Sequence, residues 1–449
     1  MALSRRSFPP ALLLLLLCVL CPARAVLAQA DPQAGTQADA EGRVLAVLDA
    51  DGREQVLALH RTLTAIPSNG PESGGAGEAK KAEAVLAWLK SQGLRDVQRI
   101  DLPDKRVPSG QRPNFAVVLP GRDTGRTLWI ISHLDTVPPG DLQAWTGDPY
   151  TLRVEGDLMF GRGAEDDHQG IVTGLLAAGA LKRARVVPPL NLGLLFVSDE
   201  EVDDTGINHV FKVRPDLLRP TDLILIPDGG TPDGRTVLLS EKKLLWLKLT
   251  VLGKQGHGSE PGKAVNSLTA AADLIVRLRG LYSEFPEQDP KFDPPSSTFE
   301  ATKVAAGVPS VNMVPGQTVF YMDMRLLPTA DVAAVRGRVR QHADAVERAR
   351  GVTVQVEVES DSVGAPETPV EAEVVRRLFR AIRAEYGVEP LARGMGARTF
   401  ASDLRARGLP CAVWMKSTAT WHQPDERSSI SSNVGDAKVV TRMLFEAAQ

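Results

Sequence analysis

Cysteine is scarce in this chain, with three residues in 449, at positions 18, 21 and 411. Two of the three lie in the first 30 residues, a segment whose composition predicts its removal during export. Removal of that segment leaves Cys411 alone, and an intrachain disulfide is then excluded. The folded protein must therefore draw its stability from its core, from bound metal or from association with another subunit.

Neither sign of charge is in excess, because 52 Lys and Arg residues face 55 Asp and Glu residues, for a formal net charge of −3. The lack of a basic excess argues against a nucleic-acid partner. A charged fraction of 24% and a hydrophobic fraction of 43% exclude wholesale disorder. Seven histidines are few enough to be considered one by one. The length allows two or three domains of about 150 residues each.

Long hydrophobic runs are absent beyond the N-terminus. The apolar run 11–20 is too short to cross about 30 Å of hydrocarbon at about 1.5 Å per residue. It follows Arg5 and Arg6 and precedes small residues, a pattern that favours a signal peptide over 1–30 rather than a retained anchor. Both the general secretion route and the twin-arginine route stay open. We expect a periplasmic or secreted protein with no membrane contact after signal removal.

Apolar runs and helical patterns alternate after a polar segment at 31–42, which we interpret as a linker. The β-like runs are 127–131, 191–197, 222–226 and 410–415, with a helical stretch at 168–183 between the first two. This alternation predicts an α/β sheet with parallel strands. Such sheets bind ligands beyond the carboxyl ends of their strands.

A second group of elements interrupts this alternation. Strands are expected at 244–252, 317–325 and 352–359, and helices at 264–281 and 329–350. With one further strand whose bounds the sequence does not define, the order strand–helix–strand–strand–helix–strand predicts a separate α+β domain, which we place at 243–361. The segments 43–242 and 362–449 would then form the two parts of one catalytic domain.

Candidate metal ligands follow each β-like run or precede the helix at 168–183: His133 and Asp135, Glu165 to Asp167, Asp199 to Glu201, Asp228, and His422 with Asp425. Taken singly, such residues are more often helix caps or solvated turns. Together at one sheet edge they predict a metal site, because imidazole and carboxylate suit zinc, and also manganese or cobalt. Two metals that share one carboxylate require four other side chains, and this set supplies them.

Several segments in this order resemble the M20 family of metallopeptidases. They are SHLDTVPPG (132–140), GRGAEDDHQG (161–170), SDEE (198–201), IPDGG (226–230), GHGSEP (256–261) and WHQPDE (421–426). The family includes carboxypeptidase G2, succinyl-diaminopimelate desuccinylase, aminoacylase-1 and carnosinase-type dipeptidases. The resemblance implies a zinc-exopeptidase-like mixed sheet sandwiched by helices, with an inserted ferredoxin-like lid or dimerisation domain.

The resemblance also implies a role for each candidate residue. One metal would be bound by His133 and Asp228, the other by Glu201 and His422, with Asp166 bridging the two. Asp135 would orient the ring of His133. Glu200 would be the general base toward a metal-activated water. The peptide bond between Asp166 and Asp167 is expected to be cis.

Four further residues are implied by the same resemblance. His257 would enter the active site of a partner subunit in a homodimer and stabilise the oxyanion there. Asn312 and Arg325 match positions that contact the oxyanion or a substrate carboxylate, and Arg398 is expected to substitute for a further carboxylate contact.

The substrate is less well defined by the sequence than the site. Aspartate at position 228 favours a peptide with a free amino end, as in aminopeptidase and dipeptidase members. A deacylase or carboxypeptidase acting on N-acyl-amino acids is the alternative within the family. A metal-free binding protein on the same fold, or a closed structural zinc site, are alternatives from other classes; a structural site would have four protein ligands per metal.

Overall fold

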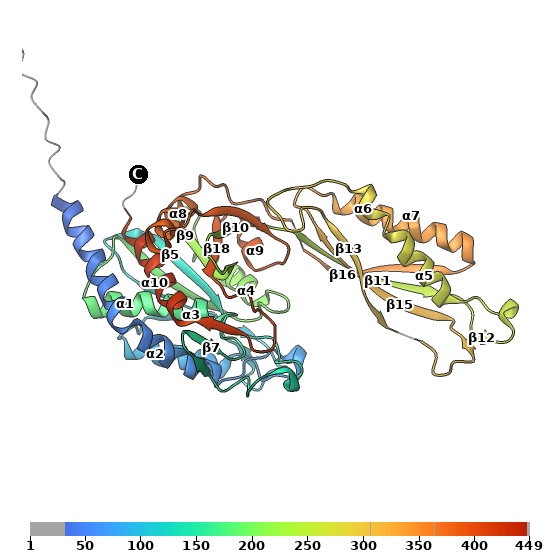
Figure 1. The fold of residues 1–449 in the computed structure, drawn as a ribbon, viewed down its shortest axis with the longest axis horizontal. Coiled ribbons are helices and arrows are strands. Elements are labelled where there is room, and N and C mark those ends of the chain that lie inside the picture. The colour runs from blue at the N-terminus through green and yellow to red at the C-terminus, as the bar shows by residue number, and fades with distance from the viewer. Residues whose placement is uncertain (1–31, 306, 363, 447–449) are drawn as a thin grey trace, which may run out of the picture.

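The computed structural model describes residues 32–446 except 306 and 363, so the predicted signal peptide lies outside the described residues. The chain forms an α/β body and an elongated second part that extends from it (Figure 1). No described helix combines the length and the hydropathy that a membrane crossing requires.

Helix α1 (Pro32–Thr64) replaces most of the predicted linker, which is a correction to the expectation for 31–42. The segment is polar, but Ala, Gln and Glu favour a helix, and the apolar stripe begins within it. Ala40, Val44 and Leu48 recur every four residues and are buried in the main core. The helix packs along α3 (His168–Ala184) and α10 (Ile430–Phe445).

The body is built on an eight-stranded sheet. Its order is β1 (Val97–Arg99), β4 (Phe115–Leu119), β8 (Leu190–Val197), β5 (Asp123–His133), β9 (Leu223–Thr231), β18 (Cys411–Lys416), β10 (Thr236–Glu241) and β17 (Leu391–Met395). The strands β8, β5, β9 and β18 are the four predicted runs, and they are parallel neighbours as expected. Both β4 and β10 run antiparallel to them, so the sheet is mixed.

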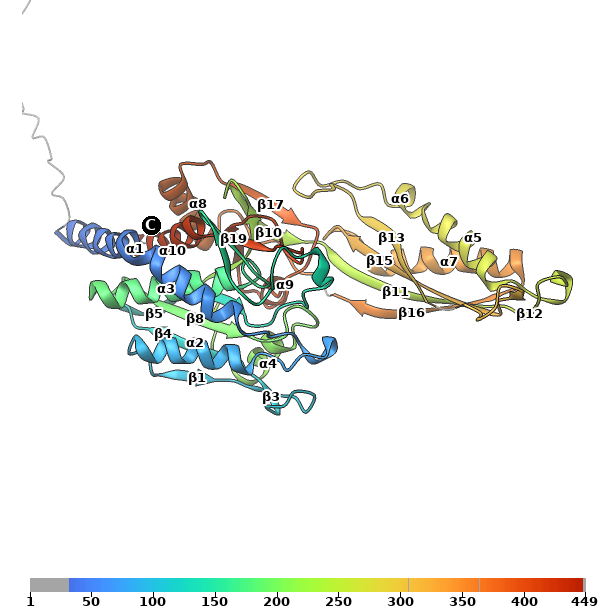
Figure 2. The ribbon, with the colours of Figure 1, turned by 60° about the horizontal axis from the view of Figure 1, so that its bottom comes forward.

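Helices cover both faces of this sheet, as Figure 2 shows. Alternate residues of β5 point to opposite faces. Leu128 and Ile130 join the core under α1, α2 (Ala79–Ser91), α3, α8 (Glu373–Tyr386) and α10. Trp129 and Ile131 join a second core under α4 (Thr205–Val213) and α9 (Ala401–Ala406). Burial on both faces explains why these strands read as continuous apolar runs.

The second part is a four-stranded antiparallel sheet with helices on one face. Its order is β13 (Thr298–Ala305), β15 (Gln317–Leu326), β11 (Lys243–Leu252) and β16 (Thr353–Asp361), with helices α5 (Ser267–Leu278), α6 (Leu281–Glu284) and α7 (Val332–Arg350). This is the ferredoxin-like topology that the resemblance implied. Leu245, Leu247 and Leu249 face the helices, whereas Trp246 on the other face is 41% exposed. The bounds of β13 were not assigned from the sequence, because the strand is mostly exposed.

The two chain crossings between the parts lie side by side. The Leu244 N–H donates to Ser362 Oγ at 2.7 Å, and the Ser362 N–H donates to the Leu244 carbonyl at 2.9 Å. The far end of the insert carries the short strands β12 (Gly256–His257) and β14 (Met313–Val314), which pair with each other (Figures 1 and 2).

Candidate metal centre

The carboxyl edge of the parallel strands gathers the candidate ligands. His133 is the last residue of β5, Asp228 lies near the end of β9, and Glu201 follows β8 in the next turn. Asp166 precedes α3, and His422 lies in the loop after β18. Parallel strands end at one edge, which is why residues from distant segments meet here.

Asp166 lies between the two histidines. Its Oδ1 is 2.8 Å from His133 Nε2, and its Oδ2 is 3.0 Å from His422 Nε2. His422 Nε2 is also 3.0 Å from Glu201 Oε2, while His133 Nε2 is 3.9 Å from Asp228 Oδ1. The structure therefore brings all five predicted ligands together, with one carboxylate placed between two imidazole–carboxylate pairs.

The charges of this cluster fit divalent cations. Burial, followed by the charge of Asp166, raises the pKa of Asp228 well above its ordinary value. Hydrogen bonds to Asp166 and Glu201 raise the pKa of His422 to about 10. The negative charge of the buried carboxylates is therefore not fully balanced by neighbouring groups, and bound cations would supply the missing positive charge. Histidine nitrogen and carboxylate oxygen are the donors that zinc, manganese and cobalt accept.

Asp135 connects the ring of His133 to the two glutamates. Its Oδ1 accepts from the Glu200 N–H at 3.2 Å and its Oδ2 from the Glu201 N–H at 3.0 Å. His133 Nδ1 is 3.1 Å from the Asp135 carbonyl and 3.5 Å from its Oδ1. Asp135 therefore orients both the imidazole and the turn that carries Glu200. Burial, followed by Asp228, raises the pKa of Glu200 well above the ordinary glutamate value.

The turn at 198–201 is held by residues that the sequence did not single out. Asp199 has a φ of +67°, in the left-handed region that non-glycine residues rarely adopt. Its carboxylate accepts from Arg112 and from the Thr205 hydroxyl. Arg112 also binds Glu78, and the Ser198 N–H donates to Asn114 Oδ1 at 2.9 Å. No local motif signals Arg112, because its contact with Asp199 spans 87 residues.

Two glutamates connect the loops that carry Asp166 and His422 by hydrogen bonds. Glu426 accepts from the N–H groups of Glu165 at 2.9 Å and Asp166 at 3.0 Å. Glu165 in turn accepts from the Ala419 N–H at 3.0 Å and the Thr420 N–H at 2.7 Å. Because a glutamate of each loop accepts hydrogen bonds from the backbone of the other loop, the two loops are held together. The Asp166–Asp167 peptide bond is cis, which confirms the expectation from the resemblance.

A cavity of about 770 Å³ opens beside the cluster and is lined by Asp166, Glu200, Glu201, Asp228 and His422 together with residues of both parts of the chain. Arg325 and Arg398, the two arginines predicted to contact substrate, lie in its wall. Both guanidinium groups are engaged: Asp323 binds Arg325, and Asp204 and Asp403 bind Arg398. Asp204 and Asp403 were not predicted.

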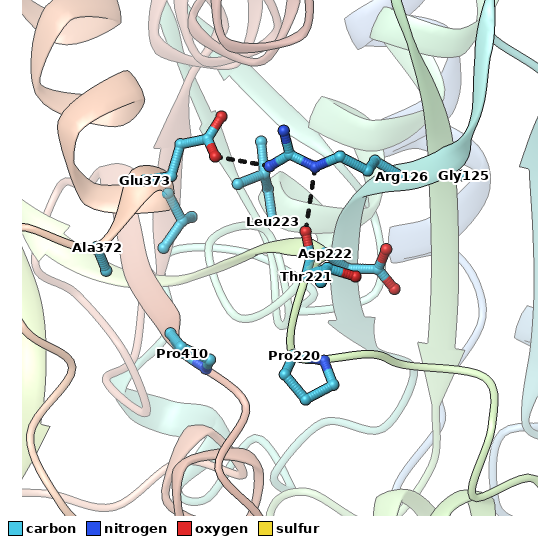
Figure 3. Close-up of a pocket in the computed structure, with 10 residues that line it drawn as sticks. Gly125, Arg126, Pro220, Thr221, Asp222, Leu223, Ala372, Glu373 and Pro410 are labelled. Carbon is cyan, nitrogen blue, oxygen red and sulfur yellow. Dashed lines mark hydrogen bonds and ion pairs between the residues drawn. The ribbon is translucent and has the colours of Figure 1, made fainter. Parts of the chain in front are cut away.

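A second cavity, of about 540 Å³, lies at the opposite, amino edge of the sheet. Figure 3 shows Arg126 bound there to Glu373 and to the Thr221 carbonyl. The carboxylate of Asp222 is fully used by neighbouring N–H groups. This cavity has ordinary ion pairing and no cluster of candidate ligands, so we place the functional site at the carboxyl edge.

His257 and Asn312 lie away from the cluster, at the far end of the insert (Figure 2). His257 is exposed, and its Nδ1 is 2.7 Å from Ser259 Oγ. The Gly258 N–H donates to the Asn312 carbonyl at 2.7 Å, so the two predicted oxyanion residues are close to each other. Within one subunit they are separate from the candidate metal ligands.

Comparison with known proteins agrees with this geometry. The chain is 34% identical to an uncharacterized metallohydrolase of Methanocaldococcus jannaschii over 87% of this chain and 99% of that protein. It is 26% identical to a succinyl-diaminopimelate desuccinylase of Cereibacter sphaeroides over 84% of this chain and 94% of that protein. The crystal structure of human carnosine dipeptidase 1 superposes with a TM-score of 0.71 at 16% identity, covering 90% of this chain and 98% of that one.

The family model described as peptidase family M20/M25/M40 matches residues 129–446. This span contains the candidate ligands and the whole insert. The protein is therefore a metallohydrolase that acts on amide bonds, and the chain belongs to peptidase family M20/M25/M40.

Proposed function

We propose that this chain is an exported, two-metal hydrolase that cleaves the amide bond of small peptides, in the manner of a dipeptidase or aminopeptidase. The observation that carries the proposal is the position of Asp166, each of whose carboxylate oxygens faces a different histidine. A single structural zinc would not require a carboxylate between two separate donor groups.

The residues divide the chemistry between them. His133 and Asp228 would hold one cation, Glu201 and His422 the other, and Asp166 both. Two bound cations would polarise the scissile carbonyl and lower the pKa of a water molecule. Glu200, held through its N–H by Asp135, accepts a proton from the attacking water and donates it to the leaving nitrogen.

A small peptide is the substrate we favour, and an N-acyl-amino acid is the alternative. Asp228 and the fold of carnosine dipeptidase 1 support the first. The relatives named as desuccinylases support the second. A binding protein without catalysis is disfavoured, because all five candidate ligands and Glu200 are present and close together.

The test is a screen of the purified protein, with zinc, manganese or cobalt, against dipeptides, N-acyl-amino acids and longer peptides. We expect about two metal ions per subunit and turnover of at least one dipeptide, with zinc as the preferred cation at equal concentration. Removal of metal by a chelator should abolish turnover. Full activity in the metal-free protein would refute the two-metal mechanism.

The position of His257 supports a homodimer that shares its active sites. We expect His257→Ala to lose activity while keeping its metal. Mixing it with Glu200→Gln protein should restore about a quarter of the wild-type activity, because half of random dimers are mixed and each has one complete site. Absence of recovery in verified mixed dimers would contradict sharing.

A further inference from the structure

The cavity beside the candidate ligands contains two permanently cationic side chains among its described lining residues, Arg325 and Arg398. An arginine in a substrate cavity normally attracts a carboxylate of the ligand. Whether it can do so depends on what already occupies its N–H groups, and in this chain both arginines are occupied.

Arg398 is held on both sides. Its Nη1 contacts Asp204, and its Nη2 lies 2.5 Å from Asp403 Oδ2. Asp204 is buried, whereas 23% of the Arg398 side chain remains exposed. One guanidinium is thus shared by two acids, and a third carboxylate would have to displace one of them.

Arg325 is neutralised as well. Its Nε and Nη2 bind the two oxygens of Asp323 at 2.7 and 3.0 Å. This uses the Nε edge of the guanidinium, one of its two edges that can bind a carboxylate bidentately, and neutralises its charge. Even if two divalent cations are bound, the negative charge of the carboxylates in and beside this cavity exceeds the positive charge of the cations and the two arginines.

Most of the remaining wall is apolar. It is formed by Leu238 and Met395 from the body and by Leu244 and Trp246 from the insert, with Trp421 next to His422. A hydrocarbon or aromatic group buried here would gain about 25 cal/mol per Å² of apolar surface. A carboxylate placed here would lose hydration without gaining a free cation.

Building on the proposed function, we propose that this cavity selects against amides whose acyl group carries a second carboxylate, and accepts an uncharged or amino-bearing apolar acyl group. Asp403 and Asp323 are the residues that set this preference, because they neutralise the arginines that would otherwise bind the extra carboxylate. The chain then differs in substrate from its relatives named as desuccinylases.

Three substrates with the same leaving group test this: Leu-Leu, N-acetyl-leucine and N-succinyl-leucine. We expect the kcat/KM of the wild-type protein to be lowest, by about tenfold or more, for N-succinyl-leucine. Asp403→Ala frees one side of Arg398 and should raise the succinyl-to-acetyl ratio of kcat/KM by about tenfold. Asp403→Asn keeps the hydrogen bond and removes only the charge, so its effect should be smaller.

Asp323→Asn, in strand β15 of the insert, provides an independent variant should Asp403→Ala, in helix α9, fail to fold. Asp216→Asn, an exposed ion-paired acid outside the cavity, is the control and should leave the ratio unchanged. Calorimetric binding of the two acyl-leucines to metal-loaded protein gives the same ratio without turnover. Absence of all turnover overturns the proposed function, whereas wild-type preference for the succinyl ligand, or an unchanged ratio in both folded variants, overturns this inference.

Discussion

Glu200→Gln is expected to lower kcat by about 10²- to 10⁴-fold, the range that general acid–base groups contribute. The amide keeps the shape of the side chain but cannot accept the proton of the attacking water. Asp135 binds Glu200 through its backbone N–H, so the turn should stay in place. Steady-state kinetics and metal analysis on the same sample measure both quantities.

The neighbouring residue supplies the matched control. Glu201 Oε2 lies 3.0 Å from His422 Nε2, so Glu201→Gln should lose metal as well as activity. Glu200→Gln should retain about two metal ions per subunit. Glu200 also lies near His133 and Asp228 in a possible ligand group, so loss of metal from Glu200→Gln would reassign it as a ligand.

The second large effect is expected from Arg112→Met. Arg112 is fully buried between Glu78 and Asp199, which are buried too. Its removal leaves two acids without a counter-charge, which should lower the free energy of unfolding by about 3–5 kcal/mol. Because Asp199 precedes Glu200 in the same turn, kcat should also fall. Urea unfolding and kinetics of metal-loaded protein measure the two effects.

Arg377→Met is the control that distinguishes a positioning role of Arg112 from a purely structural role. Arg377 is equally buried and binds Glu373 and the carbonyls of Met443 and Glu446, away from the metal cluster. We expect it to destabilise the fold while kcat stays near wild type. Equal losses of kcat in the two variants would remove Arg112 as a positioning residue. Addition of Glu78→Gln to Arg112→Met should recover part of the stability, because one uncompensated acid is removed.

The central sheet and the convergence of candidate ligands at one of its edges could be predicted from the sequence for one physical reason. Strands buried on both faces are continuous apolar runs, and parallel strands end at the same edge. The strand pattern alone therefore predicts that His133 and Asp228 lie at the same edge of the sheet. His422 was harder to place from periodicity alone, because it lies in a loop after β18, and the choice of all five ligands among the acids and histidines at this edge depended on the resemblance.

The remaining errors and omissions have different causes. The polar composition of the start of α1 predicts a linker, whereas its Ala-rich helical propensity and buried apolar stripe make it helical. The neutralisation of Arg398 by Asp204 was not foreseen, because the contact joins residues almost 200 positions apart and no periodicity records it. Buried ion pairs of this kind depend on tertiary packing, and they determine which charges remain available to a substrate.

The adjacency of the two chain crossings at Leu244 and Ser362 has an evolutionary consequence. An insertion whose ends nearly touch can be lengthened, replaced or deleted without parting any strands of the host sheet. Mutations can thus accumulate at separate rates in the body, which holds the ligands, and in the insert, which contributes Trp246 and Arg325. Exchange of the insert would change the substrate specificity while the metal ligands and the general base are inherited unchanged.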